Sequence, residues 1–278
     1  MLRWRELLLN GRWTSVLLRA MSALVSWKRC LIGFLCLVGA MTSRAEELSI
    51  AAASDLTYCL QELEVVFQKS HPDAVLKVSN GSSGNFFAQI KNGAPFDVFL
   101  SADMSYPQEL IKAGVAEESS LMQYAVGRIV LWTTNEKVDV SRGLAVLHDP
   151  QLVKKLAIAN PDHAPYGRAA KAALEQEQLW KEVQGRLVLG ENISQTAQFV
   201  ETGNADAGIV ALSIVVSPKL AKAGHYFEIP SADYPPLLQG AVLTKSGAAK
   251  PLAKAYLDFL RSPDARKIFD RYGFRLAK

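Results

Sequence analysis

The chain has 278 residues, of which 49% are hydrophobic and 21% are charged, and its formal net charge at pH 7 is +4. The positive excess lies in residues 1–45, which carry seven Lys or Arg and one Glu, so residues 46–278 retain 24 basic and 26 acidic residues, a net charge of −2. A domain without a basic excess is not typical of nucleic-acid binding, and we expect no nucleic-acid partner.

Residues 1–45 have the pattern of a secretory signal peptide. Basic residues come first, an apolar run of about 11 residues follows at 31–41, and Ser43 and Ala45 supply the small residues at positions −3 and −1 of a cleavage site. The apolar run is too short to span a bilayer as a stable helix. We therefore predict cleavage after Ala45 and a periplasmic protein. A segment beginning at Met21 would also be a complete signal, so the translation start stays open.

The cysteines and histidines do not indicate a disulfide or a metal site. Cys30 and Cys36 lie in the predicted signal, which leaves Cys59 without an internal partner. We expect Cys59 to be a small buried residue of the first helix. The four histidines are too scattered for metal-ligand spacing, and we expect no cofactor and no direct metal ligation; they are His71, His148, His163 and His225.

From residue 46 onward, strand-like and helix-like segments alternate. The strand-like runs are, in chain order, LSIAAA, AVLKVS, DVFLSA, RIVLWTT, LAIAN, RLVLG, AGIVAL and LLQGAVLT. The helices expected between them cover residues 56–70, 85–92, 107–113, 167–177 and 194–202. Two more helices, in PLAKAYLDFLRS and PDARKIFDRYGF, are expected to close the chain.

This alternation predicts an α/β protein with two lobes, each a mainly parallel sheet flanked by helices. We expect residues 46–127 and 234–278 to form lobe 1 and residues 128–233 to form lobe 2. The chain would then cross between the lobes twice, and the two crossing strands would form a hinge.

Four of the predicted strands end in a small polar turn that begins a helix. The turns are Ser54-Asp55, Gly81-Ser82-Ser83-Gly84, Ala164-Pro165-Tyr166-Gly167 and Asn192-Ile193-Ser194. The first N–H groups of a helix have no intrahelical partner, and the helix dipole is positive there. Such turns bind anions without a positively charged side chain, and the one cation beside them is Arg168. Four of them predict a pocket for a small oxyanion.

The side chains at these turns have alternative roles. Ser54 is a helix N-cap, a ligand donor or both, and Ser83 either donates to a ligand or belongs to an ordinary Gly/Ser turn. Tyr166 is a pocket wall, a phenol donor or a core residue, and Ile193 can contribute only its backbone N–H. Asp55 would repel a dianion, so we expect it to cap the helix; as a proton acceptor it would instead favour hydrogen phosphate.

Six segments resemble, in chain order, the periplasmic molybdate-binding proteins of ABC importers. They are AAASDL, GSSGNFFAQIKNGAPFDVFLSAD, LAIANPDHAPYG, GENISQ, ADAGIVAL and IFDRYGF. The resemblance covers essentially all of residues 46–278, and the second segment is its most specific part. It implies a type II periplasmic-binding fold in which neutral donors hold molybdate or tungstate in a cleft. It also implies a membrane permease with a cytoplasmic ATPase as partner and no enzymatic activity, and we expect a monomer.

Transferred by motif, the resemblance implies a ligand set made of Ser54, the Asp55 amide, Ser83, Tyr166 through its hydroxyl or its amide, and the Ile193 amide. Some members of the family donate from a tyrosine in the segment matching GIVAL, where this chain has Ala211. The chain is therefore similar to the subgroup with its tyrosine in the APYG turn. The number of hydrogen bonds and the preference between molybdate and tungstate stay open.

Two alternative functions stay open. The first is a receptor for sulfate, phosphate or a small carboxylate. The second is a secreted hydrolase with Ser83 or Ser54 as nucleophile and the turns as its oxyanion hole. The hydrolase is disfavoured because the chain has no G-x-S-x-G motif and no histidine at a recognisable catalytic position.

Overall fold

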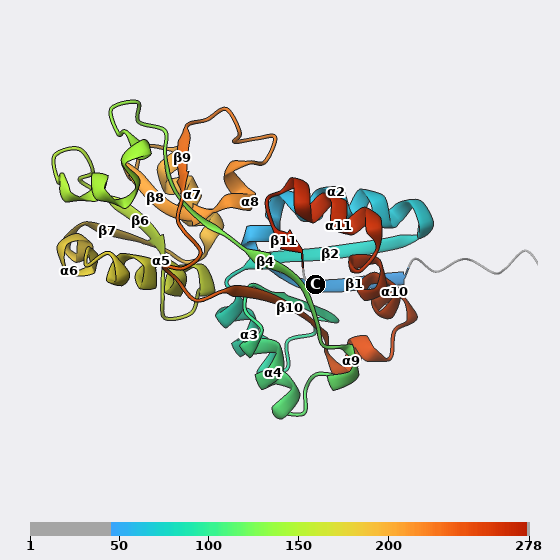
Figure 1. Cartoon of the computed structure of the whole chain (residues 1–278). Coiled ribbons are helices and arrows are strands. Elements are labelled where there is room, and N and C mark those ends of the chain that lie inside the picture. The colour runs from blue at the N-terminus through green and yellow to red at the C-terminus, as the bar shows by residue number, and fades with distance from the viewer. Residues whose placement is uncertain (1–45, 277–278) are drawn as a thin grey trace, which may run out of the picture. The chain divides into compact units, whose positions relative to one another are not determined.

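The computed structural model describes residues 46–276, which belong to one structural unit (Figure 1). The predicted signal peptide at 1–45 and its cleavage site lie outside the described residues. Within 46–276, no helix has the length and apolar character needed to cross a membrane.

Two mixed β-sheets form the framework. The first sheet has the strand order β11-β4-β10-β3-β1-β2, and the second has the order β7-β6-β8-β5-β9. The first contains β1 (Glu46–Ala53), β2 (Ala74–Gly81), β3 (Val98–Ser101), β4 (Met122–Gly127), β10 (Leu237–Leu243) and β11 (Arg275–Leu276). The second contains β5 (Ile129–Thr133), β6 (Leu156–Ala159), β7 (Leu187–Gly190), β8 (Ala207–Ala211) and β9 (His225–Glu228).

Helices cover both faces of the first sheet. One face carries α2 (Thr57–Ser70), α10 (Pro251–Leu260) and α11 (Pro263–Arg271), and the opposite face carries α3 (Ser83–Lys91) and α4 (Ser105–Lys112). Figure 1 shows α2 and α11 on one side of the strands and α3 and α4 on the other. Because both faces are covered, the central strand β3 is a continuous buried run, Val-Phe-Leu-Ser, rather than an alternating one.

The second sheet is packed in the same way. Its main helices are α5 (Pro165–Gln176) and α7 (Ile193–Glu201), and β6 is again buried along its whole length. The remaining helices are short: α6 (Trp180–Val183), α8 (Leu212–Val215), α9 (Lys245–Ala248), η1 (Ser54–Leu56), η2 (Glu118–Ser120), η3 (Val140–His148) and η4 (Gln184–Arg186).

The two-lobed α/β prediction is confirmed, but the sheets are mixed rather than mainly parallel. Strand β1 pairs in parallel with β2 and β3, and β6 pairs in parallel with β7 and β8. Strand β10 is antiparallel to β3 and β4, and β5 is antiparallel to β8 and β9. The antiparallel pairs arise because β5 and β10 enter their sheets directly from the other sheet.

The chain passes between the sheets twice. β4 ends at Gly127 in the first sheet, and β5 begins at Ile129 in the second. β9 ends at Glu228 in the second sheet, and β10 begins at Leu237 in the first. The sequence pattern did not predict β4 or β9; the latter, His-Tyr-Phe-Glu, is a largely exposed edge strand without an apolar run.

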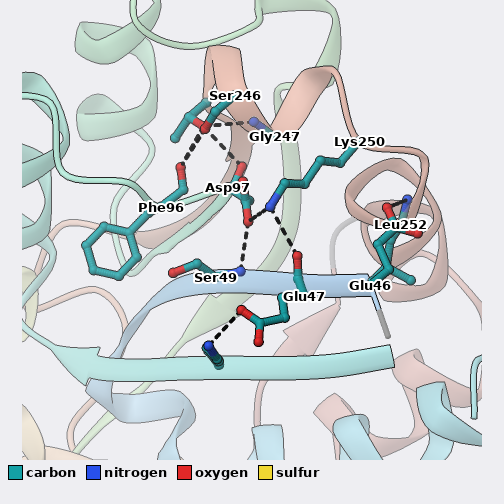
Figure 2. Close-up of polar contacts among 11 residues, drawn as sticks. Glu46, Glu47, Ser49, Phe96, Asp97, Ser246, Gly247, Lys250 and Leu252 are labelled. Carbon is teal, nitrogen blue, oxygen red and sulfur yellow. Dashed lines mark hydrogen bonds and ion pairs between the residues drawn. The ribbon is translucent and has the colours of Figure 1, made fainter. Parts of the chain in front are cut away.

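A polar cluster fixes the start of α10 against the first sheet (Figure 2). Buried Asp97 accepts hydrogen bonds through Oδ2 from the Ser49 amide at 2.8 Å and from Lys250 Nζ at 2.7 Å. Lys250 also donates to the Glu47 carbonyl at 3.1 Å. The cluster joins β1 to a helix about 200 positions later in the sequence and so stabilises the sheet that carries two of the polar turns.

Candidate functional site

The polar turns predicted from sequence surround one small cavity. Its volume is about 10 Å³, and small residues such as Ala53, Ala102 and Ala164 form part of its wall. All five predicted site residues line it: Ser54, Asp55, Ser83, Tyr166 and Ile193. Pockets for drug-sized ligands hold roughly 300–1,000 Å³, so this cavity is far too small for such a ligand.

Sheet register explains why distant turns meet. In the first sheet Ala53 of β1 is paired with Gly81 of β2, so the turns after these parallel strands lie side by side. In the second sheet Ala159 of β6 is paired with Gly190 of β7, which brings the other two turns together. The carboxyl ends of parallel strands form a common edge, where ligands bind in open α/β sheets.

Three helices begin at the cavity. The amide N–H groups of Ser83, Tyr166 and Ile193 lie in the first turns of α3, α5 and α7, and within residues 46–276 they donate to no acceptor. Pro165 at the start of α5 has no N–H, so the Tyr166 amide is the first donor of that helix. The cavity therefore receives unpaired amides and the positive ends of three helix dipoles.

Two buried serines are oriented to donate. Ser83 Oγ accepts a hydrogen bond from the Ala102 amide at 3.0 Å, and Ser54 Oγ accepts one from the Ser194 amide at 3.4 Å. Each hydroxyl proton has no acceptor in the described chain, so it is available to a ligand. No side chain caps η1 or α2, so Ser54 is not an N-cap.

Ser82 has a structural role instead. Its Oγ accepts a hydrogen bond from the Asn85 amide at 3.3 Å and thus caps α3. It also lies 3.0 Å from Nδ1 of His163, which belongs to the turn after β6. Ser82 therefore fixes the first turn of α3 and contacts the second sheet.

The prediction that Asp55 caps the helix is wrong. Its Oδ2 accepts hydrogen bonds from the Tyr166 hydroxyl at 2.9 Å and from Gln239 Nε2 at 2.5 Å, while its Oδ1 is buried without a partner. Burial raises the pKa of Asp55 from its ordinary 3.8 to about 6, and the bonds from Gln239 and Tyr166 oppose part of that rise. The capping rule considers only neighbouring residues, and it gave the wrong role because the hydrogen-bond partners of Asp55 come from other parts of the chain.

The Tyr166 phenol is engaged by this carboxylate. Because its proton is donated to Asp55, only the Tyr166 amide remains available to a ligand. Burial and the nearby Asp55 raise the pKa of Tyr166 well above its ordinary range, so the phenol stays neutral.

Sequence reasoning missed Gln239 and Tyr124. The Tyr124 hydroxyl donates to Gln239 Oε1 at 2.7 Å, which orients the amide so that Nε2 faces Asp55. The sequence signal that could have identified Gln239 is a polar residue inside the apolar run LLQGAVL. The pairing of β10 with β4 shifts its register at this point, between Gln239 and Gly240.

Arg168, the cation predicted beside the turns, does not line the cavity. It forms an ion pair with Asp103, and its NH1 donates to the Tyr106 hydroxyl at 3.0 Å. Both partners follow β3 in the first sheet, whereas Arg168 lies on α5 beside the second. The guanidinium thus joins the two sheets, and the cavity's positive potential comes from helix ends.

Other groups of the described chain do not form a comparable site. Within residues 46–276, no three His, Cys, Asp or Glu side chains are grouped so that they could hold a metal ion. Cys59 is buried in α2, as expected, and burial raises the pKa of its thiol. A larger, open groove lies between α2 and α11, but its walls mix charged and apolar side chains such as Glu62, Val65 and Lys267.

Comparisons with known proteins support the geometry. A family model described as bacterial extracellular solute-binding protein matches residues 48–275. The chain is 38% identical to the molybdate-binding protein ModA of Rhodobacter capsulatus over 235 residues, covering 84% of this chain and 90% of that protein. It is 38% identical to ModA of Azotobacter vinelandii over 237 residues, covering 85% and 93%. A solved structure of the A. vinelandii periplasmic molybdate-binding protein matches with a TM-score of 0.78 and 34% identity, covering 83% of this chain and all of that one.

Proposed function

This chain belongs to the bacterial extracellular solute-binding protein family, and we propose that it is the molybdate-binding receptor of an ABC importer. The observation that carries the proposal is the cavity itself. It is far too small for an organic ligand, it receives three unpaired helix-start amides and two serine hydroxyls, and no cationic side chain of residues 46–276 lines it.

These donors suffice for tight binding. A hydrogen bond to a charged group contributes about 1.5–3 kcal/mol, so five donors give on the order of 10 kcal/mol before the costs of desolvation and closure. That range corresponds to a Kd between micromolar and nanomolar values. We therefore propose a high-affinity receptor.

The donors come from both sheets. Ser54 and Ser83 follow strands of the first sheet, whereas Tyr166 and Ile193 follow strands of the second. An ion that needs all of them binds the closed form more tightly than an open one, and this difference in affinity drives closure. We propose that the lobes move as residues 46–127 with 234–278 against residues 128–233.

The partners follow from this role. We propose that the monomeric protein, exported to the periplasm by the segment at 1–45, delivers its ion to a membrane permease driven by a cytoplasmic ATPase. As a solute-binding protein it is not an enzyme. The serines of the hydrolase alternative, Ser54 and Ser83, hydrogen-bond no histidine in the described chain.

Selectivity would depend on size. Neutral donors arranged around a tetrahedral ion cannot distinguish dianions of equal charge, so the cavity must do so by its dimensions. We propose that molybdate and tungstate both fit and that sulfate and phosphate bind more weakly.

Titration calorimetry tests the proposal. The purified, ligand-free protein is titrated with molybdate, tungstate, sulfate and phosphate in turn. We expect one site for molybdate and tungstate and little heat from the other two. Preferential binding of sulfate or phosphate would mean that the pocket binds a different oxyanion. No binding heat from any of the four ions would contradict the receptor function.

A further inference from the structure

Asp55 lines a cavity otherwise suited to anions, and one of its carboxylate oxygens has no partner. The residue lines the cavity and is only 1% exposed, and its Oδ1 has no hydrogen-bond partner in the described chain. Buried polar atoms without a partner are rare in native proteins and call for an explanation. A ligand that supplies or shares a proton would satisfy this oxygen.

The surrounding hydrogen bonds favour Oδ1 as the position of a proton on Asp55. Oδ2 already accepts from the Tyr166 hydroxyl and from Gln239 Nε2. Tyr124 donates to Gln239 Oε1 and so prevents the amide from turning its oxygen toward Asp55. A proton on Oδ1 keeps all of these bonds, whereas a proton on Oδ2 would have to reverse the bond with the Tyr166 hydroxyl.

Within residues 46–276, no cationic side chain pairs with Asp55. The ionisable groups electrostatically coupled to it are Cys59, Tyr124 and Tyr166, and burial raises the pKa of each, so all three stay neutral near pH 7. The elements packed against η1 are α2, α7, α8 and β2. Their other ionisable side chains are Lys77, paired with Glu47; Glu62, paired with Arg271; Glu201, paired with Lys219; and Tyr58, Glu64 and Lys69 on α2. Asp55 also meets α5 through Tyr166 and β10 through Gln239. On α5 the ionisable side chains are Arg168, paired with Asp103, and Lys171, paired with Glu175, and β10 carries none.

We propose that Asp55 takes up one proton when an oxyanion enters the cavity and donates it from Oδ1 to an oxygen of the bound ion. The proton comes from solvent, one O–H bond forms on the carboxyl group, and no bond of the oxyanion breaks. The inference rests on the proposed function and adds that each captured dianion arrives together with one proton. Protonation turns Asp55 from a repelling charge into a further neutral donor.

The direction of the pH dependence follows from linkage. Burial already places the pKa of Asp55 at about 6, and a dianion beside Oδ1 raises it further. Between the pKa of the free site and that of the occupied site, binding consumes one proton. The Kd then rises by up to about tenfold for each unit of pH above 6.

The test is titration calorimetry of the purified protein with molybdate, between about pH 6.5 and 8.5, in buffers that differ in ionisation enthalpy. The dependence of the observed heat on the buffer counts the protons taken up. We expect an uptake approaching one proton at the alkaline end, with the Kd rising up to about tenfold per pH unit. This measurement needs no variant, so it does not depend on how a substitution folds.

Asp55→Asn supplies a second measurement. An asparagine can accept from Tyr166 and Gln239 through Oδ1 and present Nδ2 to the cavity, so it imitates the protonated carboxyl group. We expect no proton uptake and a Kd that is independent of pH. His163→Gln is the matched control, because the His163 imidazole contacts Ser82 between the sheets. We expect that variant to keep the proton uptake of the wild type.

The outcomes separate the two proposals. Tight molybdate binding without proton uptake, or an equal pH dependence in Asp55→Asn, would overturn the role of Asp55 and leave the receptor function standing. Loss of the proton uptake in His163→Gln would assign the proton to His163 and also overturn it. Failure of the wild type to bind any oxyanion would overturn the receptor function, and this inference with it.

Discussion

The amide N–H of Gly84, in the first turn of α3, donates a 3.0 Å hydrogen bond to the carbonyl oxygen of His163. Gly84 follows a strand of the first sheet, and His163 lies in the turn after β6 of the second. A β-carbon at Gly84 would lie 2.5 Å from that carbonyl oxygen. The closed arrangement of the two sheets thus requires glycine at this position.

Gly84→Ala is expected to weaken molybdate binding at least about tenfold, because overpacking of this kind costs about 1–3 kcal/mol and about 1.4 kcal/mol corresponds to a factor of ten. Calorimetric titration measures the effect. Gly185→Ala is the control, since its β-carbon would meet nothing within 4 Å. Equal affinity in both variants would mean that the ion binds without this close contact.

Ser83→Ala removes a buried hydroxyl donor and leaves the Ala102 amide without its acceptor. We expect a loss of about 1–3 kcal/mol in the free energy of molybdate binding, because the buried anion is one donor short. Ser119→Ala, at an exposed position outside the cavity, should change nothing. A titration curve identical to that of the wild type would show that the Ser83 hydroxyl does not bind the ion.

Arg168→Gln removes the ion pair with Asp103 and the contact of the guanidinium with the Tyr106 ring, whose centre lies 5.4 Å away. The pair is partly exposed, so we expect a modest effect: about 3–10-fold faster release of molybdate in a stopped-flow measurement. Lys171→Gln, on the same helix, should release the ion at the wild-type rate because Lys171 contacts only Glu175 of α5 and the Trp180 ring of α6, both beside the second sheet. A loss of more than about 100-fold in affinity would instead indicate direct contact between Arg168 and the ion.

Asp55→Asn should stabilise the ligand-free protein at neutral pH. Because burial raises the pKa of Asp55 from 3.8 to about 6, the wild-type carboxyl favours the folded state fully below pH 3.8 and loses that contribution as the pH rises through 6. A shift of this size corresponds to roughly 3 kcal/mol. We expect urea unfolding at pH 7.5 to show the variant more stable by about 2–3 kcal/mol, with the difference fading near pH 4. A less stable variant at pH 7.5 would show that the bonds to the charged carboxylate outweigh its desolvation.

Lys250→Met leaves the buried Asp97 carboxylate with the Ser49 amide but without its cation. We expect a loss of about 2 kcal/mol in the free energy of unfolding, since the lysine is partly exposed and water replaces some of its interaction. Lys77→Met, which breaks an exposed pair with Glu47, should cost less than about 1 kcal/mol. Equal losses of unfolding free energy in Lys250→Met and Lys77→Met would contradict the stabilising role of the Asp97 cluster. Molybdate affinity should be unchanged in both variants.

The turns of the site could be predicted because their signals are local. Ser83, Tyr166 and Ile193 each stand between a short apolar run and a helix, and a strand-to-helix turn exposes amides whatever the rest of the chain does. The convergence of the turns also follows from a general rule, since carboxyl ends of parallel strands share an edge. Their role as ligands of an ion stays a prediction.

The environment of Asp55 could not be predicted because its partners are remote. Tyr166 lies 111 positions away, after the first crossing between the sheets, and Gln239 lies 184 positions away, after the second. A local capping rule therefore gave the wrong role. The same crossings reverse β5 and β10, which is why alternation of strands and helices predicted sheets more parallel than they are.

A crystal structure of the protein with bound tungstate tests the central claim most directly, because anomalous scattering locates the ion without reference to the protein atoms. We predict one site in the cavity, with oxygens accepting from the Ser54 and Ser83 hydroxyls and from the Ser83, Tyr166 and Ile193 amides. An ion bound elsewhere, or held in the cavity mainly by the Arg168 guanidinium, would contradict a receptor that captures its ligand with neutral donors from both sheets.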